Sequence, residues 1–378
     1  MGEVITEKKQ RLQFIDMARS VAIILMLEGH FVDTTLDLLY RRPNNIKKFA
    51  NPDFFAYDIW EYIRGFTAPM FLTITGVVFV YLLLGKEDVP FWQNVRVKKG
   101  FKRVVELMFW GFLLQPSAFH VLQCISVGIL LILFTYGLSR LVKVIPIYIY
   151  FFLLGTLFFV LNIYIERLPV EVPWPENAPT VIQNMIRSTK NRALFPVVPW
   201  LGFTFYGAFI GALIFKFKDS ILSYKSAALV FVIGLCLYSF PTEILVYFNK
   251  LFLLNSFEAL HKIDWLYIRI GMILMILAVL IAINTFKGSI KDNLFLKMGQ
   301  NTLTIFITHF MILYGSIIVI GINDFFKLNL NPYQSAFGAL IFVLYFALFV
   351  KYLDWIKSKL SFILDPIKQF WIKVYKLG

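Results

Sequence analysis

The chain has 378 residues, of which 59% are hydrophobic, 18% aromatic and only 16% charged. Soluble domains are about 45–50% apolar, so this composition excludes an ordinary soluble protein. The mean hydropathy of +0.71 and repeated apolar runs of about twenty residues instead predict a polytopic membrane protein. Because these runs do not alternate in the manner of strands, a helical bundle is favoured over a barrel.

The net charge of +14 does not require nucleic acid, because most cations fall in short segments between apolar runs. We therefore expect no nucleic-acid partner. Cys124 and Cys236 both lie inside apolar runs and give no disulfide framework. No His-x-x-x-His, Cys-x-x-Cys or carboxylate cluster occurs, so we expect no metal. No small-residue cleavage site follows the first apolar run, which predicts a retained span.

In chain order, ten segments are interpreted as membrane spans. They cover residues 14–33, 60–84, 104–117, 121–141, 144–165, 196–216, 225–247, 265–285, 298–321 and 334–353. The predicted fold is therefore all-α, a polytopic bundle of about ten transmembrane helices, with one domain over residues 1–353. Residues 354–378 follow as a basic amphipathic tail, with tryptophans among lysines, which is typical of a segment at the membrane interface.

Lysine and arginine are more frequent on the side of the membrane that would carry both termini. The positive-inside rule therefore places both termini in the cytoplasm. Two long loops, residues 34–59 and 166–195, then lie outside, where loops of this length are either connectors or binding surfaces. We expect a multi-pass protein of a bacterial cytoplasmic membrane, surrounded by the lipid bilayer.

The first span carries ionisable residues on one face. Arg19 and His30 are eleven residues apart, about three helical turns, so they point the same way with a rise of roughly 16 Å between them. Asp16 lies one turn before Arg19, and Asp33 one turn beyond His30. Ionisable groups inside a span are costly and are functional candidates. The alternative is a histidine that packs between helices and charges that reach the interface.

Three further positions carry candidate chemistry. Arg64 lies near the outer end of the second span, where it would anchor the helix, form an ion pair or bind an oxyanion. Asn301 begins the ninth span and is a candidate cap. His309 lies in the middle of that span, and a hydrogen bond to a neighbouring helix is its simplest role. The basic run before the third span fixes topology or binds phosphates, and it includes Lys99, Lys102 and Arg103.

The order and spacing of several segments resemble the transmembrane acyltransferase superfamily, which joins the family-3 acyltransferases to the heparan-α-glucosaminide N-acetyltransferase-like proteins. The segments are Asp16-x-x-Arg19 with Gly29-His30, Arg64 to Pro69 with Gly76, the basic run, Val121 to Ile125, Pro199-Trp200-Leu-Gly202 with Gly207 and Gly211, and Met298 to His309. The fourth and fifth are more similar to the heparan-type branch. The chain departs from the family at Ser20, where glycine is usual, and in the paired arginines, which are matched only loosely by Lys99, Lys102 and Arg103.

The resemblance implies an acyl-CoA-dependent O- or N-acyltransferase. It would move an acyl group, with acetyl favoured, from cytoplasmic acyl-CoA to an extracytoplasmic glycan hydroxyl or amine. His30 is implied as the base or transient acyl carrier, and Asp33 as the group that orients it. Arg64 and Asn301 are implied at the oxyanion. The residues implied in donor binding are Arg19, Asp16, Lys99, Lys102, Arg103 and His309.

Two other readings of the same polar face stay open at this point. One is a transporter or flippase for a glycan or lipid precursor, although the sequence shows no internal repeat of the kind such folds usually carry. The other is a non-catalytic assembly factor that acts through its long outer loops. The sequence leaves open the acceptor, the acyl chain length, direct against two-step transfer, and whether the chain forms a homo-oligomer.

Overall fold

The structure is a computed structural model, and it describes residues 12–86, 88–116, 118–167, 185, 194–251, 262–288, 290–291, 293–315, 320–359 and 361. These residues form helices and contain no named strand, which confirms the all-helical class. The chain divides into two compact units. The first comprises Met1–Ala18 and Asp58–Ile290, and the second Arg19–Tyr57 and Lys291–Gly378.

Within the described residues, six helical segments are long and apolar enough to cross a membrane. They are Pro52–Leu84, Val121–Leu141, Ile147–Ile165, Val197–Lys216, Asp264–Lys287 and Pro332–Lys351. A seventh is possible only if Tyr224–Ser239 and Pro241–Tyr247, which meet at an angle of 87°, form one broken span. The chain is thus an integral membrane protein, but the predicted count of about ten spans is not confirmed.

The other three predicted spans differ from simple apolar helices for physical reasons. Helix α1, Gln13–Thr35, forms where a span was expected, but its acidic and basic side chains keep it out of the apolar class. Helix α4, Val95–Leu114, includes the whole basic run in its first turns. Within the predicted span 298–321, helix α14, Thr302–Tyr314, is apolar but only 13 residues long, and Asn301 separates it from α13, Leu294–Gln300.

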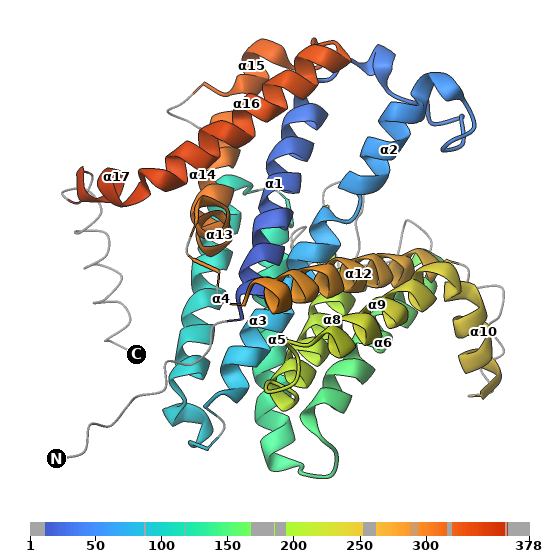
Figure 1. Ribbon diagram of the computed structural model, residues 1–378, viewed down its shortest axis with the longest axis vertical. Coiled ribbons are helices and arrows are strands. Elements are labelled where there is room, and N and C mark those ends of the chain that lie inside the picture. The colour runs from blue at the N-terminus through green and yellow to red at the C-terminus, as the bar shows by residue number, and fades with distance from the viewer. Residues whose placement is uncertain are drawn as a thin grey trace, which may run out of the picture. The chain divides into compact units, whose positions relative to one another are not determined.

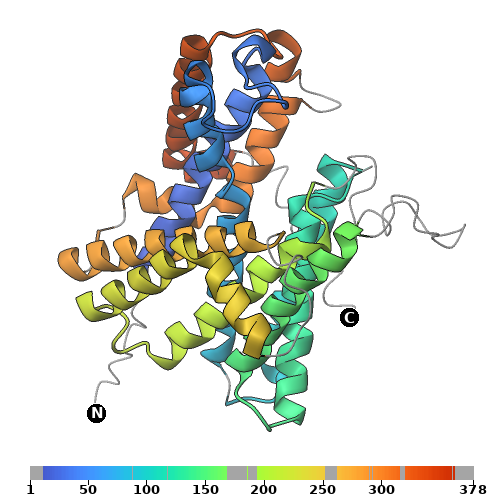
Figure 2. The ribbon, with the colours of Figure 1, turned by 90° about the vertical axis from the view of Figure 1, so that its right-hand side faces the viewer.

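The first unit is built from long helices that pack in pairs. Helix α3 packs along α8, α6 packs on α8, and α9 packs along α12. Figure 2 shows α9 and α12 side by side. The bounds are α2 Phe55–Arg64, α3 Thr67–Leu84, η3 Phe91–Gln93, α4 Val95–Leu114, α5 Val121–Leu141, α6 Ile147–Arg167, α8 Val197–Lys216, α9 Tyr224–Ser239, α10 Pro241–Leu251 and α12 Asp264–Lys287.

Glycines let the backbones of α3 and α8 touch. A Cβ atom added to Gly207 would lie 2.0 Å from the carbonyl oxygen of Thr73, and one added to Gly76 would lie 2.1 Å from that of Thr204. No side chain fits at these distances. Small residues at such crossings allow close van der Waals packing, which is a main source of helix association in membranes.

A hydrogen bond within the first unit joins the first turn of α1 to α12. The Phe14 backbone N–H donates to Oδ1 of Asn284, 3.0 Å away near the end of α12. Asn284 is buried, and its Nδ2 donates in turn to the carbonyl oxygen of Gly288 at 2.9 Å. The first N–H groups of a helix have no partner inside the helix, so this side chain supplies one of them.

The second unit gathers the rest of α1 with the helices of the C-terminal part (Figure 1). Near the end of α1, the rings of Phe31 and Phe342 lie 5.4 Å apart, and Oγ1 of Thr35 lies 2.9 Å from Oγ of Ser335. These contacts fix α16 on α1. The remaining bounds are η1 Leu38–Tyr40, η2 Pro52–Phe54, α13 Leu294–Gln300, α14 Thr302–Tyr314, α15 Ile322–Phe326, α16 Pro332–Lys351 and α17 Leu353–Lys359.

Two predicted regions fall largely outside the described residues. Of the predicted outer loop 166–195, the structure describes only the two ends and residue 185. Of the predicted tail 354–378, it describes the part up to residue 359 and residue 361. The other predicted outer loop, residues 34–59, is described, and it contains η1, η2 and the start of α2.

Candidate functional site

Two histidines, distant in sequence, meet in the second unit. Nδ1 of His30, on α1, lies 3.0 Å from Nε2 of His309, on α14. Their ring centroids are 5.2 Å apart, with 35° between the ring planes. The distance is that of an N–H···N hydrogen bond. The structure therefore brings together the two histidines that the sequence had marked separately within predicted spans, and we call them the histidine dyad.

A backbone carbonyl assigns the tautomers of the dyad. Nδ1 of His309 lies 3.2 Å from the carbonyl oxygen of Ile305, one turn earlier in α14. A carbonyl oxygen can only accept, so Nδ1 of His309 carries the proton and Nε2 of the neutral ring is an acceptor. The proton between the rings then belongs to Nδ1 of His30. In the neutral dyad, the lone pair of His30 is therefore on Nε2.

The dyad is asymmetric in its surroundings. His309 is completely buried, and the ring of Phe306 stands edge-on to it at 5.0 Å. His30 is half-buried, and the ring of Tyr314, itself partly exposed, lies 6.3 Å from it. A hydrogen bond between groups in such an apolar setting is stronger than one in water. His30 is thus the more accessible ring of the dyad, and the buried ring of His309 accepts its Nδ1–H hydrogen bond.

Ser20 joins α1 to α13, the helix that precedes α14 in the chain. Its side chain is fully buried, and its hydroxyl donates to the carbonyl oxygen of Phe295 at 2.5 Å and accepts from the N–H of Gly299 at 3.0 Å. Both partners lie on α13. The serine that departs from the family pattern therefore has a structural role, because glycine at this position offers no such bridge.

A second polar cluster lies at the other end of this face of α1. Nη2 of Arg19 donates to Oγ1 of Thr302 at 3.1 Å. The neighbouring Asn301 closes α13, and its Nδ2 donates to the carbonyl oxygen of Lys297 at 2.9 Å. Eleven residues of helix separate Arg19 from His30, and eight separate Asn301 from His309, which correspond to about 16 and 12 Å of rise. The structure therefore places Arg19 near Asn301 but does not bring Asn301 to the dyad.

The two acidic candidates occupy opposite ends of α1. Asp16 is buried in the first turn of the helix. Asp33 is half-buried in the last turns, and its backbone carbonyl accepts from Nη2 of Arg41 at 2.6 Å. The same guanidinium group donates to the carbonyl oxygen of Leu36 at 2.9 Å. Arg41, which the sequence did not single out, thus satisfies carbonyls at the C-terminal end of α1, where a cation is favoured.

Arg64 lies in the first unit, at the end of α2. Its guanidinium carbon is 5.5 Å from the centre of the Trp60 ring. A second arginine, Arg269, which the sequence did not single out, contacts α2 near its junction with α3. Nη1 of Arg269 donates to the carbonyl oxygen of Tyr62 at 3.1 Å, and its guanidinium carbon lies 5.1 Å from the Tyr62 ring. The sequence does contain a signal for Arg269, because it lies five residues inside an apolar helix, where a charged side chain is costly.

The basic candidates form one face of α4. Lys99, Lys102 and Arg103 are spaced at three and four residues, which puts their side chains on the same side of the helix. Both lysines are exposed, whereas Nη1 of Arg103 lies 3.0 Å from Oε2 of Glu106. As for metals, no group of three or more potential ligands among His, Cys, Asp and Glu occurs in the part of the chain that the structure describes.

Comparison with known families identifies the chain. Residues 11–248 match the family model for heparan-α-glucosaminide N-acetyltransferase, catalytic. The matched range includes His30, Arg64 and the basic face of α4, whereas Asn301 and His309 follow it in the chain. No curated protein matches the chain. Because the match covers well over half of the residues, the chain belongs to the heparan-α-glucosaminide N-acetyltransferase catalytic family.

Proposed function

We propose that this membrane transferase moves an acetyl group from cytoplasmic acetyl-CoA to a hydroxyl or amine of an extracytoplasmic glycan, and that the histidine dyad is its catalytic centre. The observation that supports this proposal is the 3.0 Å hydrogen bond between His30 and His309, with the tautomers assigned by the carbonyl of Ile305. In this arrangement the accessible ring of His30 has its lone pair on Nε2, and the buried Nε2 of His309 accepts the hydrogen bond from Nδ1 of His30.

The proposed chemistry starts at Nε2 of His30. This atom takes the proton of the acceptor O–H or N–H while the acceptor attacks the thioester carbonyl. The C–S bond then breaks, a C–O or C–N bond forms, and the proton leaves with the sulfur of CoA. While His30 is charged, its Nδ1–H bond to His309 is charge-assisted and therefore stronger. His309 thus stabilises the state in which His30 holds the extra proton.

A two-step route uses the same atom as a nucleophile. Nε2 of His30 would attack the thioester, release the CoA thiolate and carry the acetyl group until the acceptor displaces it. In that route His309 can take the Nδ1 proton of His30, which leaves a neutral acetyl-imidazole. When the acceptor displaces the acetyl group, His309 returns this proton to Nδ1 of His30, and the acceptor proton leaves with the CoA thiolate. Asp33, one turn beyond His30, is proposed to stabilise the charged form of the imidazole in either route.

Donor binding is proposed for the basic face of α4 and for the polar cluster at the start of α1. Lys99, Lys102 and Arg103 suit phosphate groups. Arg19, with Asp16 on the same helix, is proposed to contact the arm of the donor. The roughly 16 Å of helix between Arg19 and His30 suits a donor whose charged end and reacting end are far apart. Arg64 is proposed at the developing oxyanion.

For Asn301 we propose a role other than the oxyanion contact that the resemblance implies. Its side chain closes α13 and lies about 12 Å along the helix from His309, so we assign it to the donor arm rather than to the oxyanion. The acceptor class rests on the family, and the topology, with both termini in the cytoplasm, rests on the distribution of basic residues.

The decisive experiment is turnover of radiolabelled acetyl-CoA by the purified protein in nanodiscs, with an amino sugar as acceptor. The wild type should transfer or hydrolyse the label, and His30→Ala should not. His120→Asn is a control, because it removes a histidine outside the dyad but keeps a side chain that can cap α5. Full activity of His30→Ala would exclude the dyad as the catalytic centre. A folded wild type without turnover would favour the flippase.

A further inference from the structure

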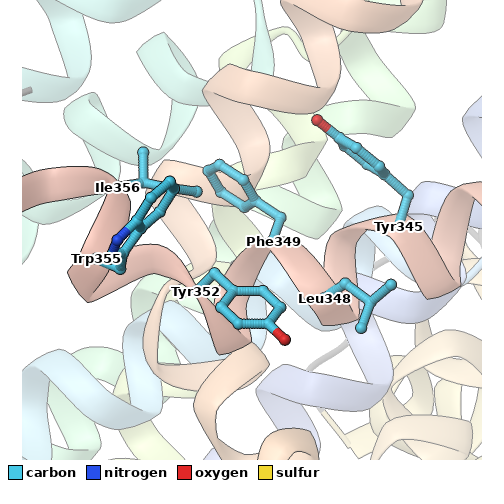
Figure 3. A pocket seen from close by; sticks show the side chains of 6 residues that line it. All are labelled: Tyr345, Leu348, Phe349, Tyr352, Trp355 and Ile356. Atoms are coloured by element: carbon cyan, nitrogen blue, oxygen red, sulfur yellow. The ribbon is translucent and has the colours of Figure 1, made fainter. Parts of the chain in front are cut away.

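The second unit carries a hollow at the joint of α16 and α17. It has a volume of about 610 Å³, and Figure 3 shows the side chains around it. This volume is within the range of small-molecule sites, roughly 300–1,000 Å³. The lining is entirely aromatic or aliphatic and consists of Tyr345, Leu348, Phe349, Tyr352, Trp355 and Ile356. Such a lining favours a hydrocarbon chain over a polar ligand.

The hollow lies where a membrane helix ends. Helix α16 is one of the candidate spans and ends at Lys351, and the short helix α17 follows with a lysine-rich last turn. Trp355 is 61% exposed and Tyr352 is 52% exposed. Tryptophan and tyrosine are enriched at the level of the lipid headgroups. The hollow is therefore expected at the depth where acyl chains meet headgroups.

Positive charge borders the apolar lining. Nζ of Lys351 lies 5.4 Å from the centre of the Tyr352 ring, which is part of the lining. Lys359 follows Trp355 by four residues and so shares its face of α17. Lys357 adds a third cation, and Asp354 is the one carboxylate in residues 351–359. The excess charge beside the hollow is thus positive.

We propose that this hollow binds an anionic phospholipid, with an acyl chain against the aromatic lining and the phosphate near the three lysines. A zwitterionic phospholipid offers the same acyl chains but no net charge, so charge complementarity selects the anionic one. This site is separate from the histidine dyad, and the proposal does not depend on the acetyltransferase activity.

Fluorescence quenching by brominated lipids tests the proposal on the full chain. Purified protein in mixed micelles is titrated with phosphatidylglycerol or phosphatidylcholine that carries bromine on the same acyl chain. Subtraction of the Trp355→Phe titration isolates the signal of Trp355 from that of the other seven tryptophans. Phosphatidylglycerol should quench Trp355 at a much lower mole fraction than phosphatidylcholine.

The lysines set the expected magnitude. One lysine near an anionic surface strengthens binding about fivefold, which corresponds to about 1 kcal/mol. Replacing Lys351, Lys357 and Lys359 together with glutamine should therefore reduce the preference for phosphatidylglycerol by up to about a hundredfold. A matched triple variant, in which the exposed Lys218, Lys225 and Lys287 of the first unit become glutamine, should keep the preference.

Three results would overturn the proposal. The first is equal quenching midpoints for the two lipids. The second is a preference that the Lys351, Lys357 and Lys359 variant retains. The third is no quenching of Trp355 by either lipid, which would mean that another segment or a second copy fills the hollow. If the triple variant does not fold, Lys359→Gln alone should weaken phosphatidylglycerol binding about fivefold and leave phosphatidylcholine unchanged.

Discussion

Replacing His309 by leucine and by glutamine separates two ways in which it can act on His30. Leucine removes the acceptor at Nε2, so nothing at this position holds the Nδ1 proton of His30. Glutamine places an amide oxygen near the same point, so it can hold that proton but cannot take it up. The comparison therefore distinguishes a group that fixes the tautomer from a group that also receives a proton.

The structure sets the size of the expected effect. The bond is 3.0 Å long and His309 is completely buried, so water does not replace the lost partner. A hydrogen bond to a charged group contributes about 1.5–3 kcal/mol, and His30 is charged while it holds the acceptor proton. At about 1.4 kcal/mol per tenfold, His309→Leu should lower kcat/KM roughly 10- to 150-fold. His30→Ala should cost more, on the order of 10²- to 10⁴-fold.

The assay is acetyl transfer in nanodiscs, measured as kcat/KM from pH 5 to 9, with each variant present at equal abundance and with unchanged helix content. If His309 only fixes the tautomer, His309→Gln should keep most of the activity. If His309 receives the proton, the glutamine and leucine variants should lose similar amounts, and the pH profile should change shape in both. Wild-type kcat/KM with an unchanged profile in His309→Leu would refute the role assigned to the dyad.

Three other predictions follow from the described contacts. Ser20→Ala leaves two buried backbone groups of α13 without their bridge, so it should lower the thermal midpoint by the equivalent of about 1–3 kcal/mol, measured by melting in detergent. Gly207→Ala should destabilise the protein by about 1–3 kcal/mol or more in the same assay, whereas Gly137→Ala, whose Cβ would meet the Phe91 ring at 3.4 Å, should be neutral or stabilising. Replacing Lys99 and Lys102 with glutamine should raise KM for acetyl-CoA severalfold and weaken its salt dependence, with little change in kcat. A Gly207 variant as stable as wild type, or an unchanged KM in the lysine variant, would contradict these assignments.

The spacing of residues along the sequence predicts much of the helical fold and part of the candidate site. The eleven-residue step from Arg19 to His30 follows from helix geometry alone, and α1 does form over both residues. The long apolar helices were also predictable, because a bilayer requires about twenty apolar residues. The partner of His30 was not, since His309 lies 279 residues away and only tertiary packing brings the two rings together.

The predicted span over residues 298–321 contains an apolar helix that is shorter than the sequence suggested. Helix α14 covers only Thr302–Tyr314, because Asn301 separates it from α13 and Gly315, with a φ of 78°, follows its last residue. In the structure the Asn301 side chain bonds to the carbonyl oxygen of Lys297 and ends α13. This competition between side chain and backbone is local, whereas the bond from the Gly299 N–H to Ser20 of α1 comes from a residue 279 positions away.

The acceptor of the His309 Nδ1 proton is a main-chain atom, and this affects how the site can be studied genetically. Ile305 contributes its carbonyl oxygen whatever its side chain is, as long as α14 stays helical. A deep mutational scan would therefore score position 305 by packing alone and would not reveal its part in the proton arrangement. Removing that contribution takes chemical synthesis or an expanded genetic code, for instance an amide-to-ester replacement between residues 305 and 306, which weakens the carbonyl as an acceptor.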